Sequence, residues 1–370
     1  MNILSSIIEK QFLFGKKTIK FFLKILYFFS LMRYKYFYRN FFYSTRILII
    51  FDYHTAVKYL DGFVKSELIC VKKYSKAYDG VDNQKKPITI IVTKDDYEKI
   101  VFQYKRLSEI GIDNFIYIDN GSTDGTIEWL KNKNNVSIYS INQKYNGTKK
   151  NGWQSKIINI FGLDRWYLIL DSDEVLNYPN SENRSISHLV NFFEENDCIR
   201  PIAFLLDMHS NKLSLTKKKK LETFNYFDNN YQLSHHENGM MVKGGFRSNY
   251  FDFKDSNSPW LTKFPLFKAT KNDVFRTHFS YPYYKNFSKN FLIVLQHYKF
   301  THKDLEILED IIREELYASK SKQYVIYKQK FDKKNFITKN IFTQKMSSSL
   351  DLLKIPLFEN HMCKNWLEID

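Results

Sequence analysis

The sequence predicts an α/β fold in which a doubly wound, mostly parallel sheet is flanked by helices. Short apolar runs alternate with amphipathic stretches from Pro87 onward, which is typical of parallel strands joined by crossover helices. Polar, glycine-containing or acidic loops follow two of these apolar runs, as expected where parallel strands end. With 370 residues, the chain is long enough for one large domain with a buried core.

The expected elements follow one another at short intervals after Pro87. Strands are predicted at residues 88–92, 115–118, 136–141, 166–170 and 202–206, and helices at residues 97–110, 126–131, around 156–161 and 301–317. Apolar residues at helical spacing indicate the first of these helices, and Gly111 suits its end. Thr301 and Asp304 resemble a capping pair for the last helix, and Gly244 and Gly245 indicate a tight turn.

A change of composition near residue 87 divides the chain into three predicted parts. Residues 1–86 form a basic, aromatic-rich N-terminal segment, residues 87–300 the α/β domain, and residues 301–370 a helical C-terminal extension. The apolar stretch 19–32 is interrupted by two lysines, so it falls short of the roughly 18 to 20 uncharged residues of a spanning helix. Two alternatives remain, an interfacial segment on an anionic membrane surface and a helix packed on the main domain. We expect a cytoplasmic chain, peripheral on the inner face of the cytoplasmic membrane in the first case.

The composition excludes a mainly disordered chain and favours anionic partners. Hydrophobic residues make up 44% of the sequence, and the formal net charge is +16, which favours nucleic acid, acidic lipid or phosphorylated substrates. The frequent Lys, Asn, Ile, Tyr and Phe are typical of AT-rich coding, and no zinc, RRM or helix-turn-helix signature is present. Nucleic acid is therefore the least favoured partner. The three scattered cysteines, Cys70, Cys198 and Cys363, predict buried thiols in a reducing compartment.

An acidic tetrad, Asp171-Ser172-Asp173-Glu174, directly follows the apolar run 166–170. Carboxylates held this close repel each other unless a cation or a proton lies between them. Mg²⁺ and Mn²⁺ prefer such oxygen ligands together with substrate phosphates. The alternative for an isolated motif of this kind is a solvated acidic turn, but its position at a strand end favours a metal site.

A second polar loop, residues 119–125, ends the strand predicted at 115–118. As structure alone it is a turn followed by a helix start, in which Gly121 and Gly125 relieve backbone strain. As a functional loop it offers Asp119, whose carboxylate can accept hydrogen bonds from a nucleobase or a ribose. Both loops are expected at the same edge of the sheet.

These two loops resemble motifs of glycosyltransferase family 2. Residues 115–126 resemble the nucleotide-binding loop of that family, and residues 166–174 followed by Tyr178-Pro179 resemble the DxD strand of a branch that includes transferases of bacterial surface polysaccharides. Further motifs of that branch recur in order at Leu205–Met208, Lys243–Arg247, Leu261–Leu266, Arg276–His278 and Leu295–Phe300. The resemblance covers about residues 88 to 300.

The resemblance implies a GT-A, Rossmann-like domain and a metal-dependent, inverting sugar transfer in the synthesis of surface polysaccharide or lipooligosaccharide. The donor would be a UDP-sugar, the acceptor a glycan or glycolipid, and the metal Mn²⁺ or Mg²⁺; a hexosyl or N-acetylhexosaminyl group would be transferred. Carried over by residue, the nucleotide or its phosphates would contact Asp119, Asn120, Asp171, Arg247 and Lys263. The metal would be held by Asp171, Asp173 and His297, with His278 as a second candidate histidine.

Two departures from the family pattern concern the donor contacts and the catalytic base. Lys94-Asp95-Asp96 stands where the family carries an Asn-Glu pair after its first strand. No Glu-Asp pair of the kind that supplies the base is present, so the candidate bases are Asp207, Glu237, Asp252 and Asp255.

Two other functions remain as alternatives. A nucleotidyltransferase also uses a Rossmann-like sheet and acidic metal ligands, but it needs a glycine-rich loop after the first strand, and residues 93–97 contain no glycine. A basic, non-enzymatic protein that binds nucleic acid or membrane agrees with the net charge. Salt-sensitive binding to nucleic acid without affinity for UDP would favour that second alternative.

Overall fold

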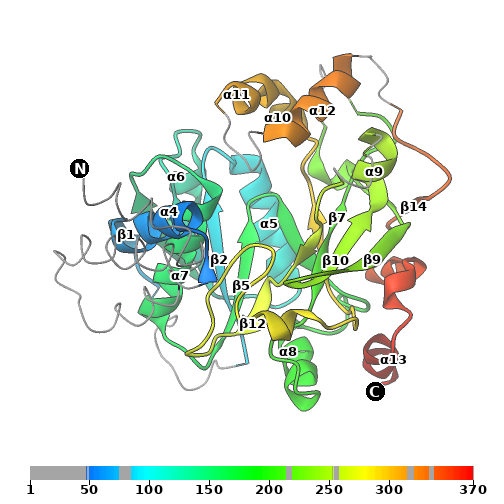
Figure 1. The fold of residues 1–370 in the computed structure, drawn as a ribbon, viewed down its shortest axis with the longest axis horizontal. Helices are drawn as coiled ribbons and strands as arrows, with labels where there is room; N and C mark the ends of the chain where they lie inside the picture. Colours follow the sequence, from blue (N-terminus) through cyan, green and yellow to red (C-terminus); the bar gives the residue numbers. More distant parts are fainter. Residues whose placement is uncertain are drawn as a thin grey trace, which may run out of the picture.

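The computed structural model describes residues 47, 50–74, 85–213, 219–251, 253, 258–314, 321–332 and 337–369. It has a mixed α/β fold built around a mixed sheet of mostly parallel strands, as the sequence predicts (Figure 1). The basic, aromatic stretch 1–46, for which an interfacial position is an alternative, lies outside the described residues. Among the described residues, none of the helices has both the length and the apolar character that crossing a membrane requires.

The main sheet has the strand order β1-β4-β3-β2-β5-β12. Its four central strands are parallel, and the edge strands β1 and β12 are antiparallel to their neighbours. The strands are β1 (Leu68–Lys72), β2 (Ile88–Thr93), β3 (Phe115–Asp119), β4 (Val136–Ile141), β5 (Trp166–Asp171) and β12 (Leu266–Lys268). The strand order reverses between β2 and β5, and ligands of open α/β sheets bind beyond such a switch point.

Helices cover both faces of this sheet. Helices α5 (Tyr97–Glu109) and α6 (Thr126–Lys131) pack with one set of alternating strand residues, among them Ile91, Tyr117 and Leu168. Helix α7 (Gly147–Phe161) packs on the opposite face, where Trp153 and Ile157 contact Ile90, Ile116 and Ile169. The two sets alternate along each strand because successive side chains of a strand point to opposite faces.

A second sheet continues the fold beyond the acidic tetrad. Its order is β11-β7-β13-β6, with β11 (Thr262–Lys263), β7 (Ala203–Asp207), β13 (Val294–His297) and β6 (Glu174–Asn177). The register places His297 beside Asp207 on one side and beside Glu174 on the other. A hairpin of β9 (Tyr231–His236) and β10 (Gly239–Gly244) leads into α9 (Gly245–Phe251). The predicted turn at Gly244 and Gly245 is this strand-to-helix junction, where both glycines have positive φ.

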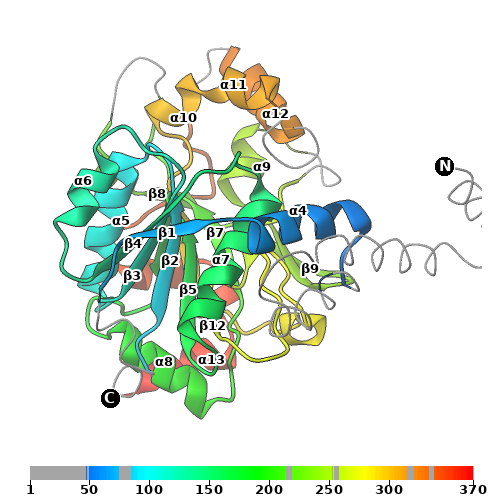
Figure 2. The ribbon, with the colours of Figure 1, turned by 90° about the vertical axis from the view of Figure 1, so that its left-hand side faces the viewer.

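The three predicted parts of the chain are corrected by the packing. In the N-terminal part, β1 pairs with β4 and α4 (Tyr53–Val64) packs on α7, so both belong to the α/β layers (Figure 2). The C-terminal part is not purely helical, because β14 (Thr343–Lys345) pairs with β8 (Tyr226–Asp228).

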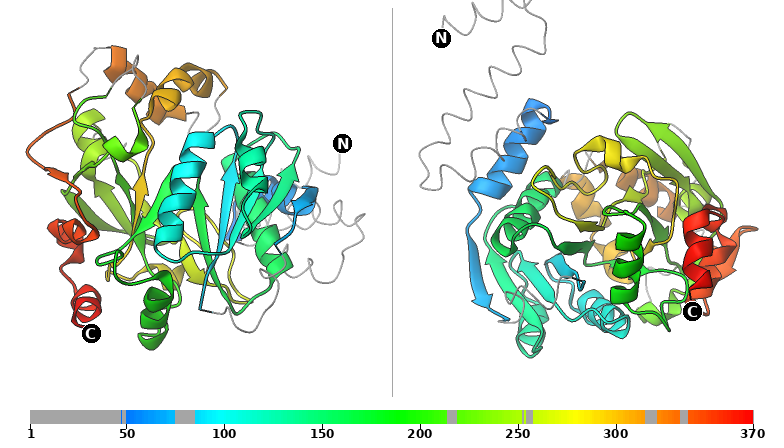
Figure 3. Two further views of the ribbon diagram at one scale, coloured as in Figure 1. Left: turned by 180° about the vertical axis from the view of Figure 1, so that it is seen from behind. Right: turned by 90° about the horizontal axis from the view of Figure 1, so that it is seen from below.

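The C-terminal part also contains short helices, which pack in different places. The single helix predicted at 301–317 is wrong: α10 (His302–Glu306) ends before Ile307, and α11 (Leu308–Arg313) follows, while residues 315–320 lie outside the described part. The predicted cap is confirmed, since Thr301 and Asp304 form a reciprocal capping box. Helix α13 (His361–Glu368) packs near α8 (Ile186–Glu195) through contacts of Trp366 with Phe192 and Tyr178 (Figure 3).

Helices α4 and α7 cross with their backbones in contact at Gly152. A Cβ atom there would lie 2.5 Å from the carbonyl oxygen of Tyr59 and 2.6 Å from the amide nitrogen of Phe63. We expect Gly152→Ala to lower the free energy of unfolding by about 1–3 kcal/mol, because overpacking outweighs the better helix propensity of alanine. Gly147→Ala is the matched control on the same helix, since no atom lies within 4 Å of its Cβ position. Equal stability of the two variants in chemical denaturation would contradict the close backbone contact between α4 and α7 at Gly152.

Candidate active site

A cavity of about 780 Å³ opens at the carboxyl ends of β2, β3 and β5. Its polar part is lined by residues that follow these strands or face them, namely Asp96, Lys99, Asn120, Lys150, Asp171, Asp173 and His297. Helices α10, α11 and α12 (Lys322–Asp332) lie over this end of the sheet (Figure 1). The cavity therefore lies where the topology predicts a binding site.

The three carboxylates of the acidic tetrad have different neighbours. Asp171 is held by lysines on both oxygens, with Lys150 Nζ at 2.5 Å and Lys263 Nζ at 3.2 Å. Glu174 is buried, pairs with Lys263 and accepts a hydrogen bond of 3.1 Å from the backbone N–H of Asp171. Burial alone would raise the pKa of Asp171, but the two ammonium groups hold it well below its usual value. Asp171 is therefore an ion-paired carboxylate that also lines the cavity, and its role as a metal and nucleotide ligand stays a prediction.

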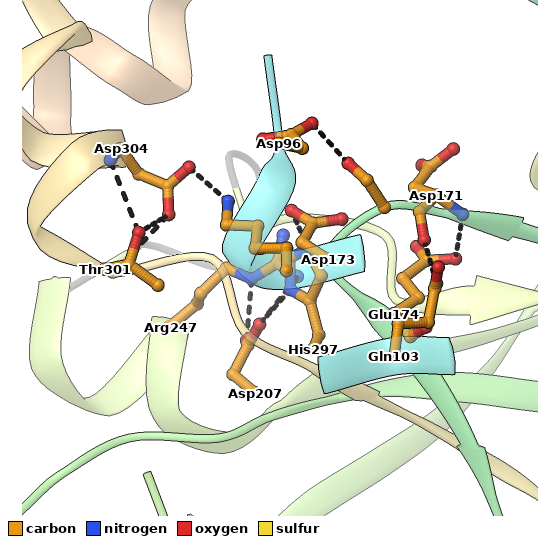
Figure 4. Close-up of polar contacts among 12 residues, drawn as sticks. Asp96, Gln103, Asp171, Asp173, Glu174, Asp207, Arg247, His297, Thr301 and Asp304 are labelled. Carbon is orange, nitrogen blue, oxygen red and sulfur yellow. Dashed lines mark hydrogen bonds and ion pairs between the residues drawn. The ribbon is translucent and has the colours of Figure 1, made fainter. Parts of the chain in front are cut away.

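Asp173 begins a chain of buried polar contacts that leads away from the cavity (Figure 4). Nε2 of His297 lies 3.3 Å from Asp173 Oδ2, and Nδ1 of the same ring lies 2.6 Å from Asp207 Oδ1. Arg247 Nε and Nη2 donate to the two oxygens of Asp207 at 2.6 and 2.9 Å. Because a carboxylate can only accept, His297 donates to Asp207 through Nδ1–H, and a protonated Nε2 donates to Asp173.

The electrostatics of this chain keep both carboxylates ionised. Burial would raise the pKa of Asp207, but Arg247 and His297 lower it to about 2. Burial would likewise raise the pKa of Asp173, which His297 and Lys99 instead hold well below its usual value. The pKa of His297 is raised by Asp173 and Asp207 against the opposing effect of burial. Asp173 is thus an ionised carboxylate at the cavity wall, paired with His297.

One carboxylate and one imidazole of this chain fit a divalent metal. Among the described residues, ligand atoms of Asp173, Glu174 and His297 lie within 4.8 Å of one another. Glu174 is already paired with Lys263, which leaves Asp173 and His297 facing the cavity. A histidine that donates its second ring N–H to a carboxylate is the usual arrangement of a metal-binding imidazole. Two protein ligands leave further coordination positions for phosphate oxygens and water, as Mg²⁺ and Mn²⁺ sites require.

Several predicted site residues have structural partners that exclude the predicted role. Asp207 is fully buried and its oxygens are taken by Arg247 and His297, so it is not a catalytic base. Arg247 and Lys263 are buried against carboxylates and do not line the cavity, which corrects their prediction as phosphate contacts. Glu237 lies exposed in the turn of the β9–β10 hairpin, outside the cavity wall. Asp252 and Asp255 lie outside the described residues.

The two predicted nucleotide contacts of the loop 119–125, Asp119 and Asn120, have different surroundings. Asp119 Oδ1 and Oδ2 accept hydrogen bonds from the backbone of Ser122 and Gly121, each at 3.1 Å, and the side chain is buried. Asp119 therefore holds its own loop, and its contact with uridine stays a prediction. Asn120 does line the cavity, where its amide nitrogen is fixed by carbonyl oxygens of Ile141 and Gln143 at 3.1 and 2.9 Å.

The second candidate histidine, His278, is not part of the cavity wall. Its Nδ1 lies 2.8 Å from the carbonyl oxygen of Thr262, and burial together with nearby Lys263 lowers its pKa to about 4. It is a partly buried histidine hydrogen-bonded to the backbone, outside the cavity wall, and its metal-binding role stays a prediction.

Sequence reasoning missed the residues that connect the first loop with the tetrad and the C-terminal helices. Ser172 Oγ donates to Asp96 Oδ2 at 2.6 Å across the switch point, and Lys99 Nζ lies 2.5 Å from Asp304 Oδ1 of α10. Burial raises the pKa of Asp96 in spite of nearby Lys99. The one signal in the sequence for Asp96 was its position in Lys94-Asp95-Asp96, where this chain departs from the family pattern. Lys99 and Lys150 carry no local signal, because each finds its partner in a remote part of the chain.

Lys263 contributes to stability through buried charges. We expect Lys263→Ala to lower the free energy of unfolding by about 3–5 kcal/mol, because Glu174 is left buried without its cation. Lys268→Ala is the matched control, since its ion pair with Glu194 is about one-third exposed on both sides and such pairs contribute about 0–1 kcal/mol. Urea denaturation of both variants checks this; equal losses would contradict the buried network.

Comparison with known proteins assigns no function to the chain, so the proposed function rests on the site. A scan against protein-family models found no match, and no curated protein sequence matches the chain.

Proposed function

We propose that this chain is a metal-dependent glycosyltransferase with a GT-A domain. It transfers a sugar from a UDP-sugar to a hydroxyl group of a glycan or glycolipid acceptor in cell-surface polysaccharide or lipooligosaccharide synthesis. The observation that carries the proposal is the chain Asp173–His297–Asp207 at the wall of a large cavity. That cavity lies at the switch point of a β4-β3-β2-β5 order, where nucleotides bind in open α/β sheets.

The residues at the cavity support different parts of a nucleotide diphosphate sugar. Asp173 and His297 would hold Mn²⁺ or Mg²⁺, and Asp207 fixes the ring of His297 so that Nε2 faces the cavity. The ion, when bound, supplies Lewis-acid stabilisation of the leaving diphosphate. Asn120 and Asp96 lie beyond β3 and β2, at the end of the cavity that suits the nucleoside.

The lysines give this wall its charge balance. Lys150 lines the cavity and neutralises Asp171, while buried Lys263 neutralises Asp171 and Glu174 from behind. Asp173 is compensated by His297 and nearby Lys99. Because the carboxylates of the wall have cationic partners, an incoming diphosphate would meet less repulsion. A carboxylate of the protein would accept the proton of the acceptor hydroxyl.

Thermal-shift titration with a panel of nucleotide sugars tests the proposal. In the presence of Mn²⁺, we expect one or more UDP-sugars to raise the Tm, because a ligand that binds the native state stabilises it. The shift should disappear in EDTA. Silence across all UDP-sugars would contradict the proposal. Release of pyrophosphate from a nucleoside triphosphate and a sugar phosphate would instead support a nucleotidyltransferase.

A further inference from the structure

The C-terminal helices line a second part of the cavity, here called its apolar half, with mainly apolar side chains and with the charged Lys303, Asp304, Asp310 and Glu314. Its wall includes Phe300 before α10, Leu308 and Ile311 of α11, and Tyr324, Tyr327 and Phe331 of α12. Each of these side chains is at least nine-tenths buried. Five of them come from α11 and α12, and Phe300 follows the end of β13, the strand that supplies His297.

The apolar wall is preformed by aromatic packing. The rings of Phe300 and Tyr327 meet edge to face with centroids 5.3 Å apart, and Tyr324 contacts Tyr327 at 5.5 Å. Behind them, Phe251 of α9 contacts Phe300 at 5.0 Å and Tyr327 at 4.5 Å. Aromatic contacts of this geometry stabilise the wall, which therefore keeps its shape without a ligand.

The apolar half begins directly beside the proposed metal site. Phe300 follows His297 by three residues, and both line the same cavity of about 780 Å³. Space lined by apolar side chains is a poor site for water, which needs polar partners. The hydroxyl groups of a nucleotide sugar would lose hydrogen bonds there. The chemistry that fits is a hydrocarbon chain attached to a polar group that stays in the other half.

We propose that the apolar half binds a hydrocarbon chain carried by the acceptor, so that the acceptor is a glycolipid-like amphiphile and not a soluble oligosaccharide. This inference rests on the proposed function, because it takes the polar half for the donor. The sugar of the acceptor lies at the boundary near Asp173 and His297, and its apolar aglycone extends between α11 and α12.

Calorimetric titration of the full-length chain tests the inference with two matched probes, n-octyl and methyl β-D-glucopyranoside. Both are titrated in the presence of Mn²⁺ and UDP, with the octyl compound kept below its critical micelle concentration. Each buried methylene contributes up to about fourfold in affinity. We expect the octyl glycoside to bind at least tenfold more tightly than the methyl glycoside, with saturation at one site.

Bulky substitutions test where the hydrocarbon chain binds. Leu308→Trp and Ile311→Trp fill the apolar half without adding a charge, and each should abolish the preference for the octyl glycoside. The matched control is Ile160→Trp, which adds the same bulk on the exposed side of α7 and should keep the preference. UDP and Mn²⁺ are titrated into every variant; unchanged UDP affinity shows that the fold and the polar half are intact. Where one cavity variant fails to fold, the other variant decides.

The outcomes separate the two proposals. Equal binding of the two glycosides to a chain that binds UDP with Mn²⁺ would overturn this inference and leave the transferase proposal standing. A preference for the octyl glycoside over the methyl glycoside that survives in both Leu308→Trp and Ile311→Trp would also overturn it. Binding of the octyl glycoside without any binding of UDP would overturn the transferase proposal and, with it, the acceptor role of the apolar half.

Discussion

Asp173→Asn should reduce the Mn²⁺-stimulated hydrolysis of a UDP-sugar by about 10³-fold. Lewis-acid stabilisation contributes several kcal/mol to such reactions, and each 1.4 kcal/mol corresponds to a factor of about ten. The asparagine keeps the size of the side chain but removes the anionic ligand beside His297. Release of UDP, followed with a coupled assay over a range of Mn²⁺ concentrations, measures the effect.

The matched control for this variant is Asp113→Asn, which changes an exposed carboxylate before β3 that pairs with Lys86. It should retain the activity of the unmodified chain. Full activity of Asp173→Asn, or activity that EDTA leaves unchanged, would be incompatible with the metal role of Asp173.

Asp207→Asn should weaken Mn²⁺ binding by about 10- to 100-fold, as the loss of a carboxylate behind a metal-binding histidine does elsewhere. The substitution replaces the carboxylate that holds Nδ1–H of His297 by a neutral amide with a single acceptor oxygen, and it leaves Arg247 buried without its counter-charge. It should therefore also cost about 3–5 kcal/mol of stability. Metal affinity is measured by titration at a temperature where the variant is folded.

A second buried carboxylate provides the control for Asp207→Asn. Asp228 is fully buried, lies 3.5 Å from His209 and accepts hydrogen bonds from Asn249 and Thr343, away from the cavity. Asp228→Asn should lose stability but keep its Mn²⁺ affinity. If both variants lose metal affinity equally, the effect of Asp207 is a general loss of folding and its positioning role is wrong.

Much of the fold could be predicted because its signals are local. The strands at 88–93, 115–119, 136–141 and 166–171 are fully or almost fully buried, so each appears in the sequence as a short, predominantly apolar run. Helix α6 has the predicted bounds. The break at Ile307 was missed because apolar periodicity continues from Leu305 into α11, and only the tertiary packing separates the two helices.

The position of the site could be predicted from the sequence, but the partners of its individual side chains could not. The tetrad and His297 were identified, and the register of β6, β13 and β7 brings Glu174, His297 and Asp207 side by side. The ion pairs of Asp171 depend on lysines from remote segments, 21 residues away for Lys150 and 92 residues away for Lys263. Pairing across such distances leaves no pattern in a single sequence.

Pulsed EPR of Mn²⁺ bound to the full-length chain with UDP tests the central claim most directly. The account predicts two couplings on the same ion, one from a histidine ¹⁴N and one from the ³¹P nuclei of the diphosphate. The nitrogen coupling should be lost in His297→Ala, since Nε2 of that ring faces Asp173 at the cavity wall. A spectrum without both couplings, or a nitrogen coupling that persists in His297→Ala, would contradict the proposed metal–diphosphate site.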